Sequence, residues 1–164
     1  LDDVNFSETH TTFNSQNLPE LEIDPLGFEK RFSYLQTNYL EKTTTDALGR
    51  RTVEVFDPMQ RIHATKVYSR EGILLAEHNI VYDGRGNPTL LTHQMILDGK
   101  PIGTYQVKSA FDCMNQKVLQ VENDAKTTKW TYHRGKLHQL TNPDGTVISY
   151  HYDPLGRLLE EMSS

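Results

Sequence analysis

Aspartate is the residue type in this chain that most invites a chemical explanation, because it returns in a similar local context along the sequence. The phrase Asp24-Pro25-Leu26-Gly27 is repeated letter for letter at residues 153–156. Closely placed carboxylates would suit acid/base catalysis or metal binding. None of the repeated aspartates has a second carboxylate beside it in local sequence, and each stands at the turn position that favours Asp. Turn capping therefore explains them better than catalysis.

Histidine and cysteine show no pattern typical of a metal or nucleophile site. The histidines stand without the cysteine pair that a zinc motif of this kind needs. Cys113, the single cysteine, lies in a predicted turn without a partner thiol or a suitably spaced histidine, so we interpret it as a bystander. The glycines of Gly84-Arg85-Gly86 fall between strands, with no helix start behind them to hold a phosphate. The seven histidines are His10, His63, His78, His93, His133, His138 and His151. The sequence predicts no catalytic residue, no metal and no cofactor, and hence not an enzyme.

A short phrase built around the aspartates recurs and predicts the architecture. It consists of an aromatic or aliphatic residue, Asp, two variable residues, Gly and a strand-like tail. Asp at the first turn position accepts backbone hydrogen bonds, Pro at the second presets φ, and Gly at the fourth tolerates a left-handed backbone. Asn17 and Asn115 stand where Gly is missing, and Asn tolerates positive φ well. The residues assigned to these turns are Asp24, Gly27, Asp46, Gly49, Asp57, Asp83, Gly86, Asp112, Asp144, Gly145, Asp153 and Gly156.

The spacing of the turns leaves room for strands but not for helices of ordinary length. Turn signals, including weaker ones at 35–38, 98–99 and 123–126, recur about every 10–14 residues. Between them apolar and polar residues alternate, as in Trp130-Thr131-Tyr132, with the period of two of a half-buried strand. A repeat of this kind indicates units that bury apolar surface only against their neighbours. We expect an all-β chain, an antiparallel strip of β-hairpins.

Aromatic residues recur near the ends of the expected strands, and two interpretations of them are open. They are Tyr34, Tyr39, Phe56, Tyr68, Tyr82, Phe111, Tyr132, Tyr150 and Tyr152. Rings stacked on one face would make a platform for carbohydrate. Alternatively, the rings pack on adjacent repeats as cross-strand pairs, each contributing roughly 0.2–1 kcal/mol. Packing is favoured, because positions fixed by the repeat are the ones that packing would use.

The best copy of the phrase resembles a known family. Residues 140–158 contain Asn142-Pro143-Asp144-Gly145-Thr146, then Tyr152-Asp153 and Gly156-Arg157-Leu158. This pattern resembles the YD repeat of Rhs proteins, of the B and C components of insecticidal toxin complexes, and of teneurins. The resemblance covers nearly the whole chain, is strongest at residues 46–91 and 130–160, and is weak before residue 20. Departures from the pattern are Gln60 and Asn115 for Gly, His133 for Asp, and the stretch 90–105, which holds no good copy.

The resemblance implies a fold and a role. Family members wind their repeats into a spiralling β-sheet that forms a hollow shell, often around a toxic C-terminal domain. At 164 residues the chain is short for such a shell. We expect residues 1–164 to be a YD-repeat array from a larger protein, with 1–20 as a degenerate first repeat. The implied role is a non-catalytic wall that encloses or presents a toxin or effector, secreted or at the cell surface, with neighbouring repeats and an enclosed toxin domain as partners.

An alternative role is a cell-surface recognition module that binds carbohydrate or a protein partner through the aromatic face. The aspartyl autoproteolysis site of some Rhs proteins is not carried over, because its paired Asp-Pro-x-Gly phrases are close together, whereas the two phrases here begin at residues 24 and 153.

Composition sets looser limits. Hydrophobic residues make up 36% of the chain, its formal net charge is −5, and its mean hydropathy is −0.62. Such a polar balance is normal for a sheet that is wetted on at least one face. The negative charge argues against nucleic acid as a partner, since phosphate binding needs a basic surface. No stretch is long and apolar enough for a membrane span.

Overall fold

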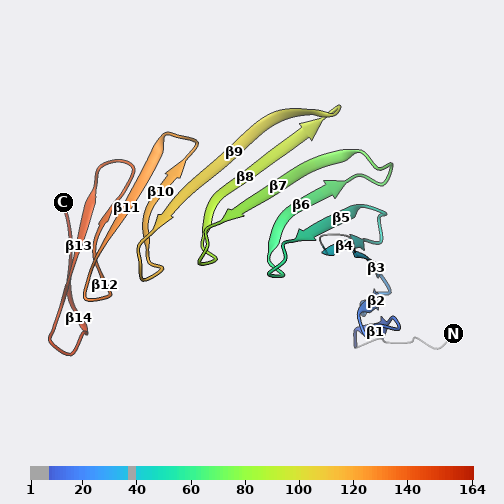
Figure 1. Cartoon of the computed structure of the whole chain (residues 1–164), viewed down its shortest axis with the longest axis horizontal. Coiled ribbons are helices and arrows are strands. Elements are labelled where there is room, and N and C mark those ends of the chain that lie inside the picture. Colours follow the sequence, from blue (N-terminus) through green and yellow to red (C-terminus); the bar gives the residue numbers. More distant parts are fainter. Residues whose placement is uncertain (1–7, 37–39) are drawn as a thin grey trace. The chain divides into compact units, whose positions relative to one another are not determined.

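The structure is a computed structural model that describes residues 8–36 and 40–164. Within these residues the secondary structure is β-strand throughout, and the fourteen strands follow one another in the sheet in sequence order (Figure 1). The prediction of an antiparallel all-β fold is confirmed. In this described part no helix has the length and hydrophobicity needed to cross a membrane. The expected turn at 35–38 lies partly outside the described residues, and Tyr39 lies outside them.

The chain divides into two compact units, residues 1–79 with 93–104 and residues 80–92 with 105–164. The strands are β1 (His10–Phe13), β2 (Pro19–Ile23), β3 (Glu29–Gln36), β4 (Leu40–Thr45), β5 (Arg51–Phe56), β6 (Ile62–Tyr68), β7 (Leu74–Tyr82), β8 (Pro88–Leu97), β9 (Lys100–Phe111), β10 (Lys117–Glu122), β11 (Lys126–His133), β12 (Lys136–Thr141), β13 (Val147–Tyr152) and β14 (Leu158–Ser163). Strands β1–β6 belong to the first unit and β10–β14 to the second, whereas β7, β8 and β9 contribute residues to both.

In the first unit the alternation of the sequence places neighbouring strands in register. Val53 of β5 pairs with Lys66 of β6, and Val55 pairs with Ala64. Ala64 is only 5% exposed, because directly paired residues lie on the same face and Val55 shields it. Most other strand residues of β4, β5 and β6 are half-buried, as expected where side chains find neighbours along a sheet but no second layer.

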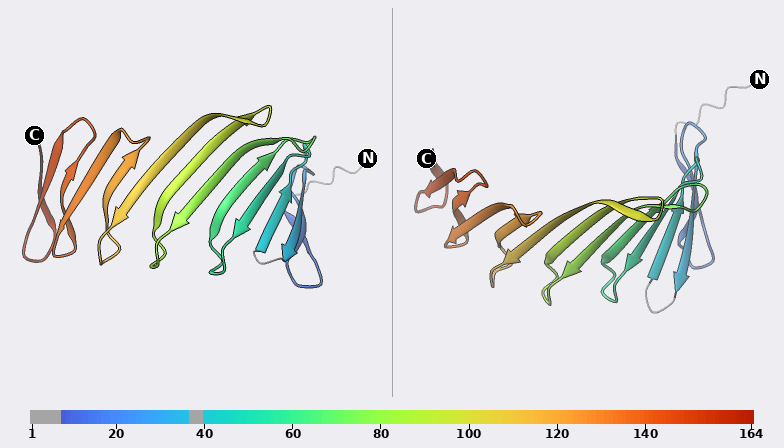
Figure 2. Two further views of the ribbon diagram at one scale, coloured as in Figure 1. Left: turned by 45° about the horizontal axis from the view of Figure 1, so that its top comes forward. Right: turned by 90° about the horizontal axis from the view of Figure 1, so that it is seen from above.

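The second unit repeats this arrangement with larger apolar side chains. Trp130 of β11 pairs with Leu140 of β12, which pairs in turn with Ile148 of β13. This row across three strands is half-buried rather than buried. Val107, 8% exposed, is the other buried apolar side chain of the described residues besides Ala64. Both views of Figure 2 show β10–β14 each beside the next strand in sequence.

Two strands are longer than the turn spacing suggests. Strand β8 has 10 residues and β9 has 12. They meet at the two-residue turn Asp98-Gly99, where both residues have positive φ (50° and 72°). Such a turn suits paired strands without a longer loop, and residues 90–105 carry no further Asp-x-x-Gly phrase to interrupt them.

A one-residue β-bulge follows six of the hairpin turns, and the alternation of the sequence does not predict it. In the β5–β6 hairpin Phe56 pairs with Ile62 while Val55 pairs with Ala64, so that His63 is the extra residue. The bulge lies at the same place in β1–β2, β6–β7, β9–β10, β11–β12 and β13–β14, beside Phe13, Tyr68, Phe111, Tyr132 and Tyr152 respectively. In contrast, β2–β3, β4–β5 and β12–β13, which have Ile23, Thr45 and Thr141 before the turn, keep an even register. In these nine hairpins the bulge therefore accompanies an aromatic residue before the turn, where it raises the local twist.

Candidate functional site

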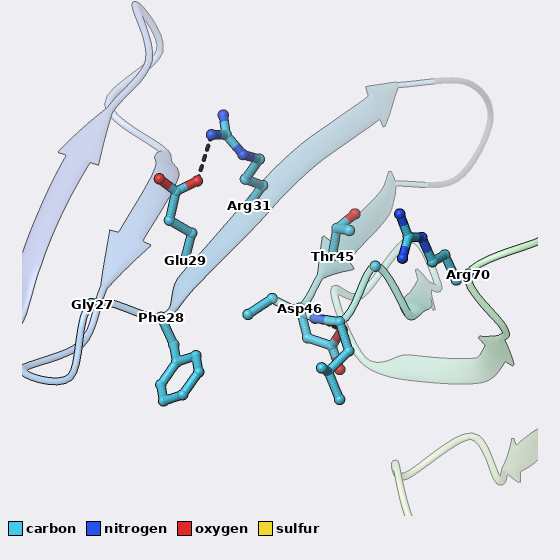
Figure 3. Close-up of a pocket in the computed structure, with 10 residues that line it drawn as sticks. Gly27, Phe28, Glu29, Arg31, Thr45, Asp46 and Arg70 are labelled. Atoms are coloured by element: carbon cyan, nitrogen blue, oxygen red, sulfur yellow. Dashed lines mark hydrogen bonds and ion pairs between the residues drawn. The ribbon is translucent and has the colours of Figure 1, made fainter.

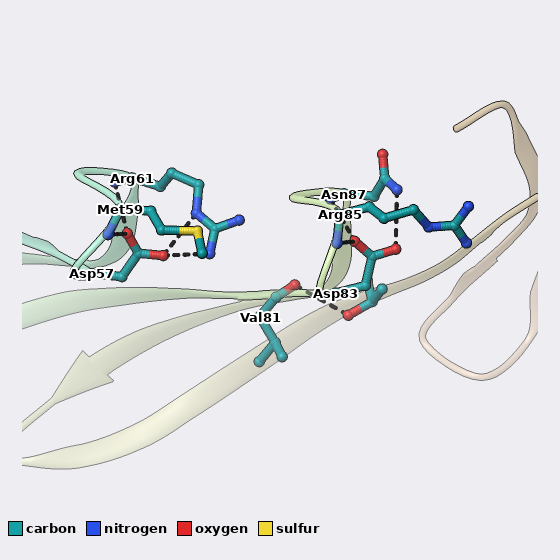
Figure 4. A network of polar contacts seen from close by, with 8 residues as sticks. Asp57, Met59, Arg61, Val81, Asp83, Arg85 and Asn87 are labelled. Carbon is teal, nitrogen blue, oxygen red and sulfur yellow. Dashed lines mark hydrogen bonds and ion pairs between the residues drawn. The ribbon is translucent and has the colours of Figure 1, made fainter. Parts of the chain in front are cut away.

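An aspartate that begins a turn closes a small network of hydrogen bonds. At Asp57 the Oδ1 atom accepts the backbone N–H groups of Met59 and Arg61, both at 2.9 Å (Figure 4). The backbone closes the turn as well, because the N–H of Gln60 donates to the Asp57 carbonyl at 2.9 Å. A single carboxylate thus satisfies two donors that would otherwise have no partner at the hairpin tip.

The same pattern recurs at the other turns. The side-chain oxygen at the first position accepts hydrogen bonds from the backbone N–H groups two and four residues ahead, at 2.8–3.0 Å. The accepting residues are Asn14, Asp24, Asp46, Asp83 and Asp112. Ser69 uses its hydroxyl in this way, with longer bonds of 3.2 and 3.3 Å. Asp144 differs, because it is the third residue of the turn that begins at Asn142, and its Oδ1 accepts the N–H of Thr146, two residues ahead, at 2.9 Å.

A cation completes three of these networks. The second carboxylate oxygen of Asp46, Asp57 and Asp153 accepts the Nε–H of the arginine four residues ahead, each at 2.7 Å. At Asp83 the amide of Asn87 takes this role at 3.0 Å. The carboxylates are therefore occupied by turn-forming contacts and are not arranged as acid/base pairs.

These contacts favour the charged form of the carboxyl groups. The side-chain hydrogen bond from Arg61, followed by its backbone N–H, holds the pKa of Asp57 below the ordinary value. The backbone N–H of Arg157, followed by its side chain, has the same effect on the pKa of Asp153. Asn87 lowers the pKa of Asp83 by its side chain and then its backbone. All three groups remain negatively charged at neutral pH.

The fourth turn position is left-handed. Gly27, Gly49, Gly86, Gly145 and Gly156 have φ between 80° and 91° there. Asn17, Gln60 and Asn115 occupy the same position with φ of 60–62°. The left-handed backbone is thus retained where the sequence departs from glycine, and Gln60 adopts it despite its longer side chain.

Neighbouring turns of the second unit are connected by side chains. The Asn87 amide donates to Asn115 Oδ1 at 3.0 Å, Gln116 donates to the Gly135 carbonyl at 3.0 Å, and Lys136 donates to the Gly156 carbonyl at 2.8 Å. Gly156 also leaves room for this lysine, because a Cβ there would lie 2.6 Å from Lys136 Cε. Residues just beyond one turn therefore support the next turn on the same edge.

The recurrent aromatic rings lie among aliphatic residues and cations. Phe56 pairs with Leu40 and Ile62, Tyr68 with Arg51 and Leu74, Phe111 with Lys117, Tyr132 with Leu137, Tyr150 with Glu161, and Tyr152 with Leu158, while Tyr82 ends β7. The Lys117 ammonium lies 6.0 Å from the Phe111 ring centre and 5.8 Å from that of Trp130, and Lys136 lies 5.2 Å from Tyr152. Long cationic side chains thus cover rings that have no second layer above them. These contacts favour the packing interpretation over an open carbohydrate platform.

Each of the two units contains a pocket. The first, of about 560 Å³, lies between the start of β3 and the turn 46–49. It is lined by the exposed apolar side chains of Phe28 and Leu48 and by Arg31 and Arg70. Figure 3 shows Arg31 paired with Glu29 at this pocket. The second, of about 450 Å³, lies between the turns 134–135 and 153–156.

The structure does not gather the other candidate residues into a catalytic or metal site. In the described part of the chain no group of three or more histidine, cysteine or acidic side chains is arranged to hold a metal ion. Cys113 is exposed in the turn after Asp112. Three of the histidines do approach one another at the second pocket. The sequence alone does not predict this, because their spacing of 5 and 13 residues becomes proximity only through strand pairing.

Comparisons with known proteins agree with this geometry. Residues 132–163 match the RHS Repeat family model. No curated protein matches the sequence. Among solved structures, the TcdB2-TccC3-Cdc42 complex has a TM-score of 0.53 at 13% identity, over 98% of this chain and 10% of that one. TcdB2-TccC3 without its hypervariable C-terminal region gives 0.52 at 12% identity, over 97% and 10%. The Tc holotoxin pore of Photorhabdus luminescens, which contains TccC3, gives 0.39 at 14% identity over 95% and 9%, below the level of a shared fold.

Fold and turns together define a repeat-built protein whose hairpins stack in one antiparallel sheet. The resemblance to Rhs, or YD-repeat, proteins stated from the sequence is confirmed by the match at residues 132–163, and the fold is shared with a stretch of the TcdB2-TccC3-Cdc42 complex. The chain spans about one tenth of the length of the solved chains that it resembles.

Proposed function

We propose that the chain is a non-catalytic structural segment of an Rhs-type β-shell that encloses or presents a toxin or effector domain. The observation that carries the proposal is the shared fold over 98% of this chain with a tenth of a chain in a TcdB2-TccC3 complex. A segment that serves as wall needs strands that pair in series and turns that return the chain, and this chain supplies both.

The chemistry of the turns also supports a structural role. The polar groups that recur most regularly, the first-position aspartates, use their oxygen atoms within their own turns. We infer that neighbouring repeats of a larger protein are the direct partners of this segment and that the shell works outside the cell that makes it. Both inferences rest on the family.

Protection of the enclosed domain from protease tests this function in the full-length protein. Val53→Pro places proline within β5, where it removes a backbone N–H donor and disrupts pairing with β4 and β6. We expect the domain carried by the shell to become digestible in this variant.

Ala47→Pro is the matched control, because residue 47 holds the second position of an Asp-x-x-Gly turn, where the turns at 24–27 and 153–156 already have proline. This variant should protect the domain as well as the natural sequence does. A domain that stays protected in Val53→Pro, or one that is never protected, would overturn the shell role.

A further inference from the structure

The pocket of the second unit brings basic and titratable side chains together at one edge of the sheet. Its volume is about 450 Å³, within the range of small-ligand sites. His133 and Arg134 line it at the end of β11, Lys136 and His138 in β12, and His151 in β13. Tyr150 and Leu155 add apolar surface.

Three imidazole rings form a row across these strands. The ring centres of His133 and His138 are 6.3 Å apart, and those of His138 and His151 are 6.4 Å apart. All three side chains are exposed, so they can meet a ligand from solvent. Histidine is the side chain that ordinarily gains a proton between neutral and mildly acidic pH. The row therefore places three imidazole rings where an anion from solvent would meet them.

Arg134 provides an independent indication of a ligand. It is the first residue of the two-residue turn Arg134-Gly135, where φ is 52° and 76°. Such a turn strongly prefers Asn or Asp at this place, and a bulky side chain with positive φ is strained. The Arg134 side chain lines the pocket and forms no ion pair with any residue in the described ranges. From a position of positive φ that presents an unpaired guanidinium to a pocket, a functional role can be inferred as a hypothesis.

The charges facing the pocket are predominantly positive. The lining groups are His133 at the end of β11, Arg134 in the turn after it, Lys136 and His138 in β12, Tyr150, His151 and Tyr152 in β13, and Asp153 in the turn after β13. Arg157, just before β14, is bonded to Asp153, and Glu160 of β14 pairs with His151. Asp153 is neutralised by Arg157 at 2.7 Å. The opposing charges of β14 are Glu160, which pairs with His151 across the strands, and Glu161, which pairs with Tyr150.

We propose that this pocket binds a phosphate or sulfate group, and that it binds this group more tightly in mildly acidic solution. Arg134 supplies the planar donors that oxyanions favour, and Lys136 adds a fixed charge beside its bond to Gly156. Any imidazole of the histidine row that carries a proton adds to the attraction. The site is separate from the proposed shell role, because it needs only the β11–β14 edge.

Sulfate binding to the full chain tests the proposal, since sulfate keeps the same charge throughout the pH range used. Sulfate is titrated into the protein at about pH 8 and at about pH 5.5 and followed by NMR, with chloride keeping the ionic strength constant. The Kd for sulfate should be at least about fivefold lower at the acidic pH, which is the effect of one added unit charge 4 Å away in water. Shifts of the Arg134 and His138 signals locate the site. Glucose 6-sulfate as a second titrant distinguishes the sources, because tighter binding than free sulfate assigns a sulfated sugar and equal binding assigns the ion.

Arg134→Asn is the decisive variant. Asn-Gly is the preferred pair for this turn, so the variant should fold at least as stably as the natural chain and yet bind sulfate about fivefold more weakly. Arg85→Asn removes the same charge from another exposed turn of the second unit and should leave binding unchanged. His138→Gln should remove much of the gain on acidification.

Three results would overturn the site. They are sulfate affinity that is equal at the two pH values, affinity that falls equally in Arg134→Asn and Arg85→Asn, and signal shifts at neither Arg134 nor His138. None of these results bears on protease protection by the shell, so the two proposals fail separately.

Discussion

At the scale of single residues, the side chain at the first position of a turn holds the turn together through hydrogen bonds to its backbone. One oxygen accepts two backbone N–H groups, and in three turns the second oxygen binds an arginine four residues on. Asp24 lacks that arginine, because Phe28 stands there, yet it makes the same two backbone bonds at 2.9 Å. The backbone contacts are therefore the general feature, and the ion pair is an addition.

Asp57→Asn tests the ion pair through its dependence on pH. The pKa of Asp57 is lowered in the folded chain, first by the hydrogen bond from the Arg61 side chain. The ionised Asp57 therefore contributes its full stabilisation above the pKa of the unfolded chain, about 4, and this stabilisation is lost as the pH falls through the lower pKa of the folded chain. Thermal melts followed by circular dichroism should show the Tm of the variant lower by up to about 4 °C at neutral pH. The difference from the natural chain should shrink in acid.

Asp24→Asn is the control for this substitution, because it removes the charge from a turn without the arginine. Its Tm at neutral pH should fall less than that of Asp57→Asn. A difference between Asp57→Asn and the natural chain that persists undiminished from neutral pH to below about pH 3 would show that the charge pair is not its source.

Gln60→Gly tests the left-handed fourth position. Gln60 has φ of 61°, and a residue with a side chain pays about 1 kcal/mol for that conformation. Urea unfolding should therefore show a gain in stability of about that size, unusual for a substitution by glycine.

The same change at Gln16, which lies in a turn but is absent from the positive-φ residues, should instead lower stability, because glycine increases the freedom of the unfolded chain. Loss of stability in both variants would contradict the role given to the left-handed position.

At the scale of elements, the hairpins are similar in their turns but fall into two groups in their registers. Those with an aromatic residue before the turn carry a bulge, and those with Ile23, Thr45 or Thr141 there do not. The sequence predicted the turns because Asp, Pro and Gly have strong local preferences. It could not predict the bulges by alternation, since one extra residue changes the phase of a strand without changing its composition.

Tyr132→Phe tests how one hairpin is attached to the strand before it. The Tyr132 hydroxyl donates to the Lys117 carbonyl at 2.9 Å, from β11 to β10, and the ring is half-buried. Removing the hydroxyl should cost about 1 kcal/mol in the free energy of unfolding by urea.

Tyr150→Phe is the matched change in the same unit, because the Tyr150 hydroxyl has no hydrogen-bond partner among the described residues. Its stability should change by a few tenths of a kcal/mol at most, as for a surface substitution. Equal losses in the two variants would mean that the bond to Lys117 contributes nothing specific.

At the scale of the whole molecule, the two units share one way of gaining stability. Each is a sheet whose side chains are mostly half-buried, and burial in the described residues is deepest at Ala64 and Val107. Contacts run from each strand to its neighbours, so stability is close to a sum of neighbouring terms, as in other repeat proteins. The sequence predicted this class of fold because its repeat extends over most of the chain. It could not predict the histidine pocket, because His133, His138 and His151 meet only when β11, β12 and β13 are paired.

Cross-strand nuclear Overhauser effects measured on the full chain test the central claim most directly, namely that the recurrent turns fold the backbone into serially paired strands. The account predicts backbone contacts between Val53 and Lys66, between Gln120 and Thr128, and between Gln139 and Ser149. Contacts between residues three and four apart within these segments, as in helices, or pairs shifted by one residue from these registers, would contradict it.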